Sequence, residues 1–161
     1  MSAAAGNVRA ESGQSLALDV FLERTLERWL SMRPGIVARR RLEGVTPAPR
    51  IVAEQTLSQA ILNILNNAAD ASPQDVTVDA RWSENELTLE IADRGPGLTP
   101  DVAQSVGTPL ASTKSDGMGL GLFLAYTTLQ RFGGDVRLAD RDGGGVVCRL
   151  TLPLAPILVS S

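Results

Sequence analysis

The stretch of residues 53–71 constrains the fold more than any other part of the chain. Apolar residues recur there at spacings of three and four, which predicts a helix with one apolar face. That face has to be buried against another element, and the alternating segments elsewhere in the chain offer a β-sheet as its partner. The apolar face is formed by Ala60, Ile61, Ile64, Leu65 and Ala68.

A neighbouring face of the same predicted helix carries amides. Gln59, Asn63, Asn67 and Asp70 follow one another at intervals of four, four and three, so their side chains form one stripe. Asn is a mediocre helix former, because its side chain competes with the backbone for hydrogen bonds. One interpretation is a solvated polar face. The other is a site for a hard cation such as Mg²⁺, which accepts amide oxygens and usually shares its site with substrate phosphates.

The remaining segments predict two more helices and about five strands. Helices are expected over 15–33 and 119–132, and strands over 36–43, 76–80, 87–91, 136–139 and 146–152, with a proline-rich loop at 46–49. The resulting fold class is an α/β two-layer sandwich, with a mixed, mostly antiparallel sheet and three main helices on one face. Residues 1–14 are expected to be a flexible arm, 15–154 the domain and 155–161 a tail.

Composition narrows the function classes. Fifteen Lys and Arg against eighteen Asp and Glu give a net charge of −3, which offers no reason to expect nucleic acid or an anionic membrane as a partner. No apolar run approaches the length of a bilayer span, so we expect a cytoplasmic domain, which could belong to a larger membrane protein. The single cysteine, Cys148, excludes an internal disulfide and is expected to be a packing thiol.

The chain contains no histidine. Any chemistry that uses an imidazole as base, nucleophile, metal ligand or phosphate acceptor must therefore take it from another chain or another segment.

The segment DRGPGL, residues 93–98, follows directly on a predicted strand. A structural turn explains this composition by itself. The functional interpretation is that Asp93 accepts a hydrogen bond from an exocyclic amine, such as that of adenine. Gly95 and Gly97 would then allow the backbone to approach the ring closely.

The segment GMGLGL, residues 117–122, places glycines at alternate positions before an apolar helix. Free backbone N–H groups and the positive end of the helix dipole would make a phosphate cradle, although a flexible hinge is the alternative. No Gly-Lys-Ser/Thr follows, so the segment is not a P-loop. The long polar connection of residues 98–118 before the helix is expected to act as a lid.

Taken in order, these segments resemble the ATP-binding catalytic domain of sensor histidine kinases, in the GHKL superfamily with its Bergerat fold. QAILNILNNAADAS resembles the family's asparagine box, DRGPGL and GMGLGL its two glycine boxes, and GGGVVCRLTLP its closing strand. The resemblance covers about residues 55–153. Within the family, the segments around the asparagine box and the second glycine box look most like the RegB/PrrB group of redox-responsive kinases.

The resemblance implies roles for individual residues. Asn67 would ligate Mg²⁺, Asn63 would help to position the metal or the phosphates, and Asp93 would bind the adenine amine. Gln59 stands where ATP-hydrolysing relatives carry a glutamate base, and an amide can only orient a group. Lys114 could reach the β- or γ-phosphate, with a solvated lysine of the lid as the alternative. The remaining residues that the resemblance places around the nucleotide are Gly95, Gly97, Gly117, Gly119, Gly121 and Leu122.

Four positions depart from the family pattern. Asp70 stands where many of these kinases carry a basic residue near phosphate, and Leu110 where a phenylalanine before the lid is usual. Val146 and Cys148 replace the usual Thr and Phe of the closing strand.

The implied activity is that of a protein-histidine kinase, with ATP and Mg²⁺ as cofactors. Its acceptor histidine would lie on a helical hairpin that this chain lacks, and its downstream partner would be a response regulator. Two alternatives remain open: a protein-serine kinase of the anti-sigma type, and a degenerate nucleotide-binding or interaction module.

Overall fold

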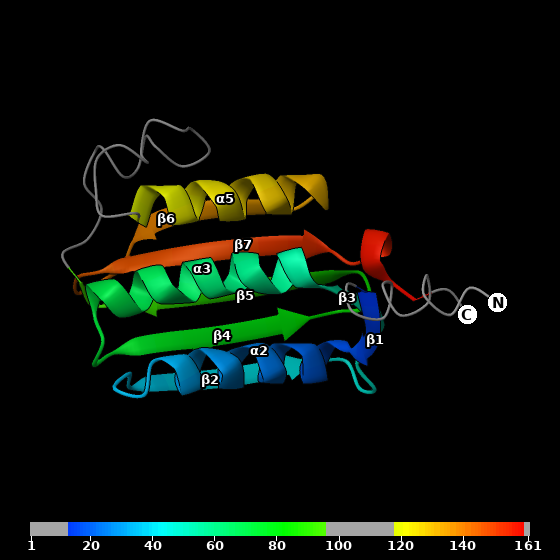
Figure 1. Cartoon of the computed structure of the whole chain (residues 1–161), viewed down its shortest axis with the longest axis horizontal. Coiled ribbons are helices and arrows are strands. Elements are labelled where there is room, and N and C mark those ends of the chain that lie inside the picture. The colour runs from blue at the N-terminus through cyan, green and yellow to red at the C-terminus, as the bar shows by residue number, and fades with distance from the viewer. Residues whose placement is uncertain (1–12, 96–117, 160–161) are drawn as a thin grey trace.

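The computed structural model describes residues 13–95 and 118–159, and its centre is a five-stranded sheet (Figure 1). The strand order is β2-β4-β5-β7-β6, in which β2 and β4 are parallel and the other neighbours are antiparallel. The strands are β2 (Ala38–Gly44), β4 (Val76–Trp82), β5 (Glu86–Asp93), β6 (Asp135–Asp140) and β7 (Val146–Pro153). The predicted mixed and mostly antiparallel sheet is thereby confirmed.

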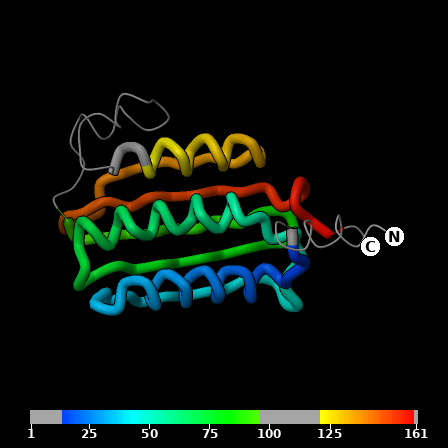
Figure 2. The backbone as a smooth tube through the Cα atoms, in the orientation of Figure 1, coloured from blue at the N-terminus to red at the C-terminus, as the bar shows by residue number. Residues whose placement is uncertain are grey.

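Three helices cover one face of this sheet, as predicted (Figure 1). They are α2 (Leu18–Met32), α3 (Gln55–Ala71) and α5 (Met118–Arg131). The central helix α3 lies between the other two and contacts both (Figure 2). Its apolar face explains this position, because Ile61, Ile64 and Leu65 are almost completely buried among the inward-facing residues of the strands. In β4, Val76, Val78 and Ala80 alternate with more exposed residues, which is the pattern of a sheet with one covered face.

A second, two-stranded sheet was not predicted. Strands β1 (Gly13–Ala17) and β3 (Arg50–Glu54) pair antiparallel, with Leu16 opposite Ile51. The sequence had suggested helix for residues 15–17 and for residues 53–54. Both helices begin directly after one of these strands, and neither has a side-chain cap, so no local signal marks the boundary.

The segment expected to be a tail packs against this small sheet as far as Val159. A short 3₁₀ helix, η2 (Ala155–Ile157), buries Ile157. Leu158 then bridges to Ile51, and the backbone N–H of Val159 donates to the carbonyl of Arg50 at 3.0 Å. Within residues 13–95 and 118–159, no helix combines the length and the apolar character needed to cross a membrane.

Candidate functional site

The amide stripe of α3 lies beside the start of α5. A Cβ built on Gly121 would lie 3.7 Å from Oδ1 of Asn67 and 3.9 Å from Cβ of Asn63. One turn earlier on α3, Nε2 of Gln59 donates to Oδ1 of Asn63 at 3.2 Å. The structure therefore brings together Gln59, Asn63, Asn67 and Gly121, which the sequence had assigned to one site.

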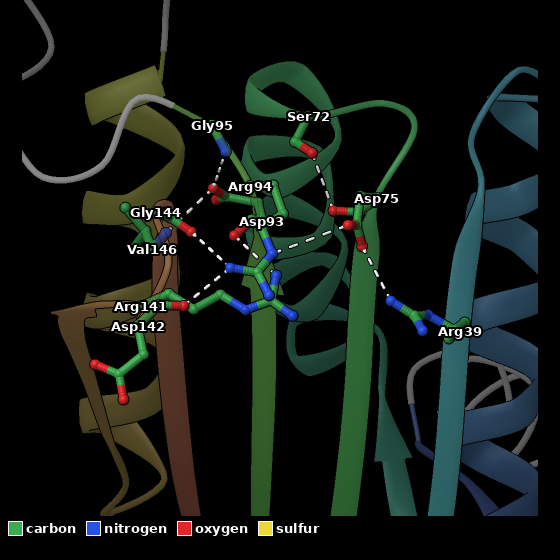
Figure 3. Close-up of polar contacts among 10 residues, drawn as sticks. All are labelled: Arg39, Ser72, Asp75, Asp93, Arg94, Gly95, Arg141, Asp142, Gly144 and Val146. Atoms are coloured by element: carbon green, nitrogen blue, oxygen red, sulfur yellow. Dashed lines mark hydrogen bonds and ion pairs between the residues drawn. The ribbon is translucent and has the colours of Figure 1, made fainter.

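Asp93 is the last residue of β5, and its side chain is only 6% exposed. Its Oδ1 accepts hydrogen bonds from the backbone N–H groups of Gly95 at 2.8 Å and of Val146 at 3.2 Å (Figure 3). Across the part of the chain that the structure describes, no hydrogen-bond donor reaches Oδ2. The two donors fix the carboxylate in one orientation and leave its second oxygen able to accept from a ligand.

A cavity of about 50 Å³ lies between Asp93 and the helices. Its lining is formed by Ile64, Asn67, Ile91, Asp93, Leu122, Leu138, Val146 and Cys148. Apolar walls with a few placed polar groups are typical of small-molecule sites. Asp93 and Asn67 are the polar residues of this lining. Leu122, which the sequence had placed around the nucleotide, is part of this wall and is 6% exposed.

Gly95 has a steric reason to be glycine. A Cβ at this position would lie 2.7 Å from Cβ of Ala71 and 2.9 Å from its carbonyl oxygen. The corner after β5 therefore packs directly on the last turn of α3. The sequence had suggested approach to a ligand ring as the reason, whereas the structure shows close approach to a neighbouring helix.

Several predicted site residues fall in a part of the chain outside the described residues. Gly97, Lys114 and Gly117 belong to residues 96–117, as does Leu110 and nearly all of the expected lid. Gly119 is described only as part of the first turn of α5. The phosphate cradle and the lid therefore stay predictions.

Arg33 was not singled out from the sequence, and its ion pair with Asp70 gives that acidic residue a structural role. Its Nη2 lies 2.8 Å from Oδ1 of Asp70, and its Nη1 donates to Oδ1 of Asn66 at 3.2 Å. Arg33 follows the last turn of α2, so these contacts join the ends of α2 and α3. Asn66 and Asp70 thus face α2, while Asn63 and Asn67 face α5. A lone arginine before Pro34 gave no signal of this pairing, because the two helices meet only in the folded chain.

Cys148 lines the same cavity as Asp93. Burial, with a smaller contribution from the Asp93 charge, raises the pKa of its thiol from 9.0 to about 12. The thiol therefore stays protonated at neutral pH and is a poor nucleophile.

This raised pKa predicts a loss of stability at high pH. A raised folded-state pKa means that the folded chain holds the proton more tightly than the unfolded chain, so its contribution is complete below pH 9 and declines toward pH 12. Between those values the free energy of unfolding should fall by up to about 1.4 kcal/mol per pH unit because of this group. Urea denaturation of wild type and Cys148→Ala at pH 8 to 11 would measure it. The free energy of unfolding of the variant should fall less steeply with pH than that of wild type. Parallel pH profiles would show that the Cys148 thiol does not have a raised pKa in the folded chain.

Comparison with known proteins agrees with this geometry. Residues 52–156 match the family model described as histidine kinase-, DNA gyrase B-, and HSP90-like ATPase. Among curated proteins, the chain is 33% identical over 162 residues to the C4-dicarboxylate transport sensor protein DctS of Rhodobacter capsulatus, covering 91% of this chain and 24% of that protein. It is 31% identical to sporulation kinase E of Bacillus subtilis, covering 70% of this chain and 16% of that protein.

Solved structures show the same fold. The catalytic domain of histidine kinase ThkA superposes with a TM-score of 0.72 at 18% identity, covering 88% of this chain and 95% of that one. The mycobacterial sensor histidine kinase MprB gives a TM-score of 0.66 at 25% identity, covering 88% of this chain and 97% of that one.

The chain therefore belongs to the family of histidine kinase-, DNA gyrase B- and HSP90-like ATPases. Within that family, the relatives and structural neighbours named above include a sensor protein, a sporulation kinase and a sensor histidine kinase, and the domain is of the ATP-binding catalytic type of a sensor kinase. The chain spans a quarter or less of the length of these two curated relatives.

Proposed function

We propose that this domain binds Mg-ATP and transfers the γ-phosphoryl group to a histidine on a helical hairpin outside these 161 residues. One observation carries the nucleotide assignment: a buried carboxylate, held through Oδ1 by two backbone N–H groups, lines a largely apolar cavity, and no donor of the described residues reaches its other oxygen. Such an oxygen accepts from the exocyclic amine of adenine and repels the carbonyl of guanine or hypoxanthine.

The residues of α3 and α5 supply the phosphate end of this site. In our proposal Asn67 and Asn63 hold Mg²⁺ through their amide oxygens, next to the N-terminus of α5, where backbone N–H groups favour negative charge. The described residues contain no cluster of three acidic or imidazole ligands. Such a sparse donor set fits a metal that takes several of its ligands from water and nucleotide. When bound, Mg²⁺ neutralises phosphate charge.

Gln59 suits transfer to a protein acceptor. Its side chain donates to Asn63, so it helps to orient the amide stripe. An amide has no basic group with which to activate water, so the domain would hydrolyse ATP slowly. In the transfer itself, an imidazole nitrogen attacks the γ-phosphorus, the bond to the β–γ bridging oxygen breaks, ADP leaves and the ring proton passes to water.

A transfer assay tests the kinase assignment. The domain is mixed with the histidine hairpin of its parent kinase and γ-labelled ATP, and the label is followed on the hairpin. Acid-labile phosphohistidine is the expected product. Tight ATP binding without phosphohistidine, at high concentrations of both proteins, would contradict the proposal, and label on a serine of an antagonist protein would favour the anti-sigma type of kinase instead.

We expect Asn67→Ala to weaken the Mg²⁺ dependence of ATP binding. Removing one metal ligand should cost about tenfold or more in affinity when Mg²⁺ is present, and little when it is chelated. Isothermal titration with and without EDTA measures both values.

The matched control is Asn66→Ala, one residue earlier on the same helix. Asn66 faces α2, where it accepts from Arg33, so its replacement should leave the effect of Mg²⁺ unchanged. Equal effects of Mg²⁺ on wild type and Asn67→Ala would remove Asn67 from the metal site.

The parent protein is proposed to be a cytoplasmic or inner-membrane sensor kinase that passes its phosphoryl group to a response regulator. The resemblance to the RegB/PrrB group stays a prediction, and the sequence of the sensing region of the parent would test it.

A further inference from the structure

We propose that Arg94 and Arg141 are positioning residues that set the selectivity of this site for an adenine base, acting through Asp93. The inference rests on the proposed function. It assigns a role to two arginines whose contacts Figure 3 shows and which are not among the residues that line the cavity.

Each of the two arginines donates to backbone carbonyls in the segment that holds the other arginine. Arg94 follows β5, and its Nη1 donates to the carbonyl of Asp142 at 2.9 Å and, more weakly, to that of Gly144 at 3.4 Å. Arg141 lies in the turn between β6 and β7, and its Nη1 donates to the carbonyl of Asp93 at 3.0 Å. Each side chain thus binds the backbone of the segment opposite its own. We call Arg94 and Arg141, with these hydrogen bonds, the arginine clasp.

The clasp adds a contact from outside to a glycine-rich turn that also has two backbone hydrogen bonds of its own, from Arg141 N–H to the carbonyl of Gly145 and from Gly144 N–H to the carbonyl of Arg141, each 2.9 Å long. Gly143, Gly144 and Gly145 all have positive φ angles, of 86°, 108° and 106°. Consecutive glycines have the greatest backbone freedom, so the contacts from Arg94 add restraint to these internal hydrogen bonds. A Cβ at Gly143 would lie 2.8 Å from Nη1 of Arg94, so the absence of a side chain there makes room for the guanidinium.

The restrained turn leads directly into the site. Val146 follows Gly145, and its N–H is one of the two donors that hold Oδ1 of Asp93. The other donor, Gly95, follows Arg94 on the opposite side of the clasp. Loosening the clasp would let these donors separate, and the carboxylate at the cavity would lose the orientation that the two hydrogen bonds give it.

A third contact extends the clasp to the loop after α3. Nε of Arg94 lies 3.9 Å from Oδ2 of Asp75, whose backbone is fixed by the hydroxyl of Ser72 at 3.0 Å. Arg94 is 41% exposed, so this ion pair alone adds little stability. The effect expected from the clasp is therefore on the orientation of Asp93, with a small effect on folding.

The test compares ATP with inosine triphosphate, which carries a carbonyl in place of the amine. Calorimetric titration of the full chain should show that Arg94→Ala weakens ATP binding about fivefold and leaves inosine triphosphate within about twofold of wild type. Arg94→Lys, which keeps a donor, should recover part of the loss. Arg137→Ala, at an exposed arginine of β6 that pairs with Asp135, is the matched control and should change neither affinity.

The outcomes separate the inference from the function on which it rests. If wild type fails to bind ATP, the proposed function is wrong. If wild type binds ATP but Arg94→Ala weakens both nucleotides equally, or neither, the positioning role is overturned. In an Asp93→Asn background, Arg94→Ala should have no further effect on ATP, and an additive loss would also overturn the role. Thermal unfolding of each variant confirms that the folded chain is being compared.

Discussion

Asp93→Asn is expected to weaken ATP binding by roughly thirtyfold to a hundredfold while leaving the fold in place. Oδ1 of the new amide can still accept from the N–H groups of Gly95 and Val146, so the internal hydrogen bonds survive. The Nδ2 group then occupies the place of Oδ2 and directs a donor at the donor of the adenine amine. Isothermal titration gives the affinity, and urea denaturation gives the stability.

The same substitution should change which base is preferred. Inosine triphosphate carries an acceptor where ATP carries the amine, so the ratio of the two affinities should fall toward one or invert. Asp93→Ala is the comparison variant. It leaves two backbone N–H groups without their acceptor and is expected to lose stability as well. An unchanged ATP affinity in Asp93→Asn would remove this residue from base recognition.

The second large effect is expected from Gly145→Ala. This residue has φ +106°, a region that side chains rarely adopt, and a Cβ would lie 2.0 Å from the carbonyl oxygen of Asp93. The turn backbone fixes the position of this Cβ and the oxygen belongs to the backbone of Asp93, so no side-chain rotation relieves the clash and either the turn or the end of β5 has to move. We expect a loss of about 3 kcal/mol in the free energy of unfolding, together with weaker ATP binding as Val146 is displaced.

The neighbouring glycine supplies the control. Gly144 has φ +108°, and a Cβ there would meet nothing within 4 Å. Gly144→Ala therefore carries the conformational cost without the clash, and should lose about 1 kcal/mol. Urea denaturation gives the free energy of unfolding of both variants, and the difference between their losses measures the cost of the clash at position 145. Equal losses would show that the close approach to Asp93 is not what requires glycine at position 145.

Much of the fold could be predicted because its elements follow local periodicity. The apolar face of α3 and the alternation in β4 and β5 depend on residues a few positions apart, so the sequence displays them directly. The small sheet of β1 and β3 could not be read in this way. Its partners are about 35 residues apart, with Leu16 opposite Ile51, and neither segment is long enough to show a pattern alone.

In the candidate site, too, the residues that could be predicted are those with a local signal in the sequence. Asn63, Asn67 and Asp93 stood out because amides on an apolar helix, and an acid between a strand and glycines, are unusual choices locally. The arginines that contact Asp70 and the carbonyl of Asp93 did not stand out, because Arg33 and Arg141 are ordinary polar residues in the sequence.

The sequence by itself determined which residues have the chemistry for a nucleotide site, and the order in which they occur. Only the tertiary structure decided which oxygen of Asp93 accepts the two backbone hydrogen bonds, since Val146, one of the two donors, is the first residue of β7 and lies 53 residues away in sequence. The physical reason is that a side chain's type is fixed locally, whereas its hydrogen-bond partners depend on which distant backbone segments the sheet places beside it.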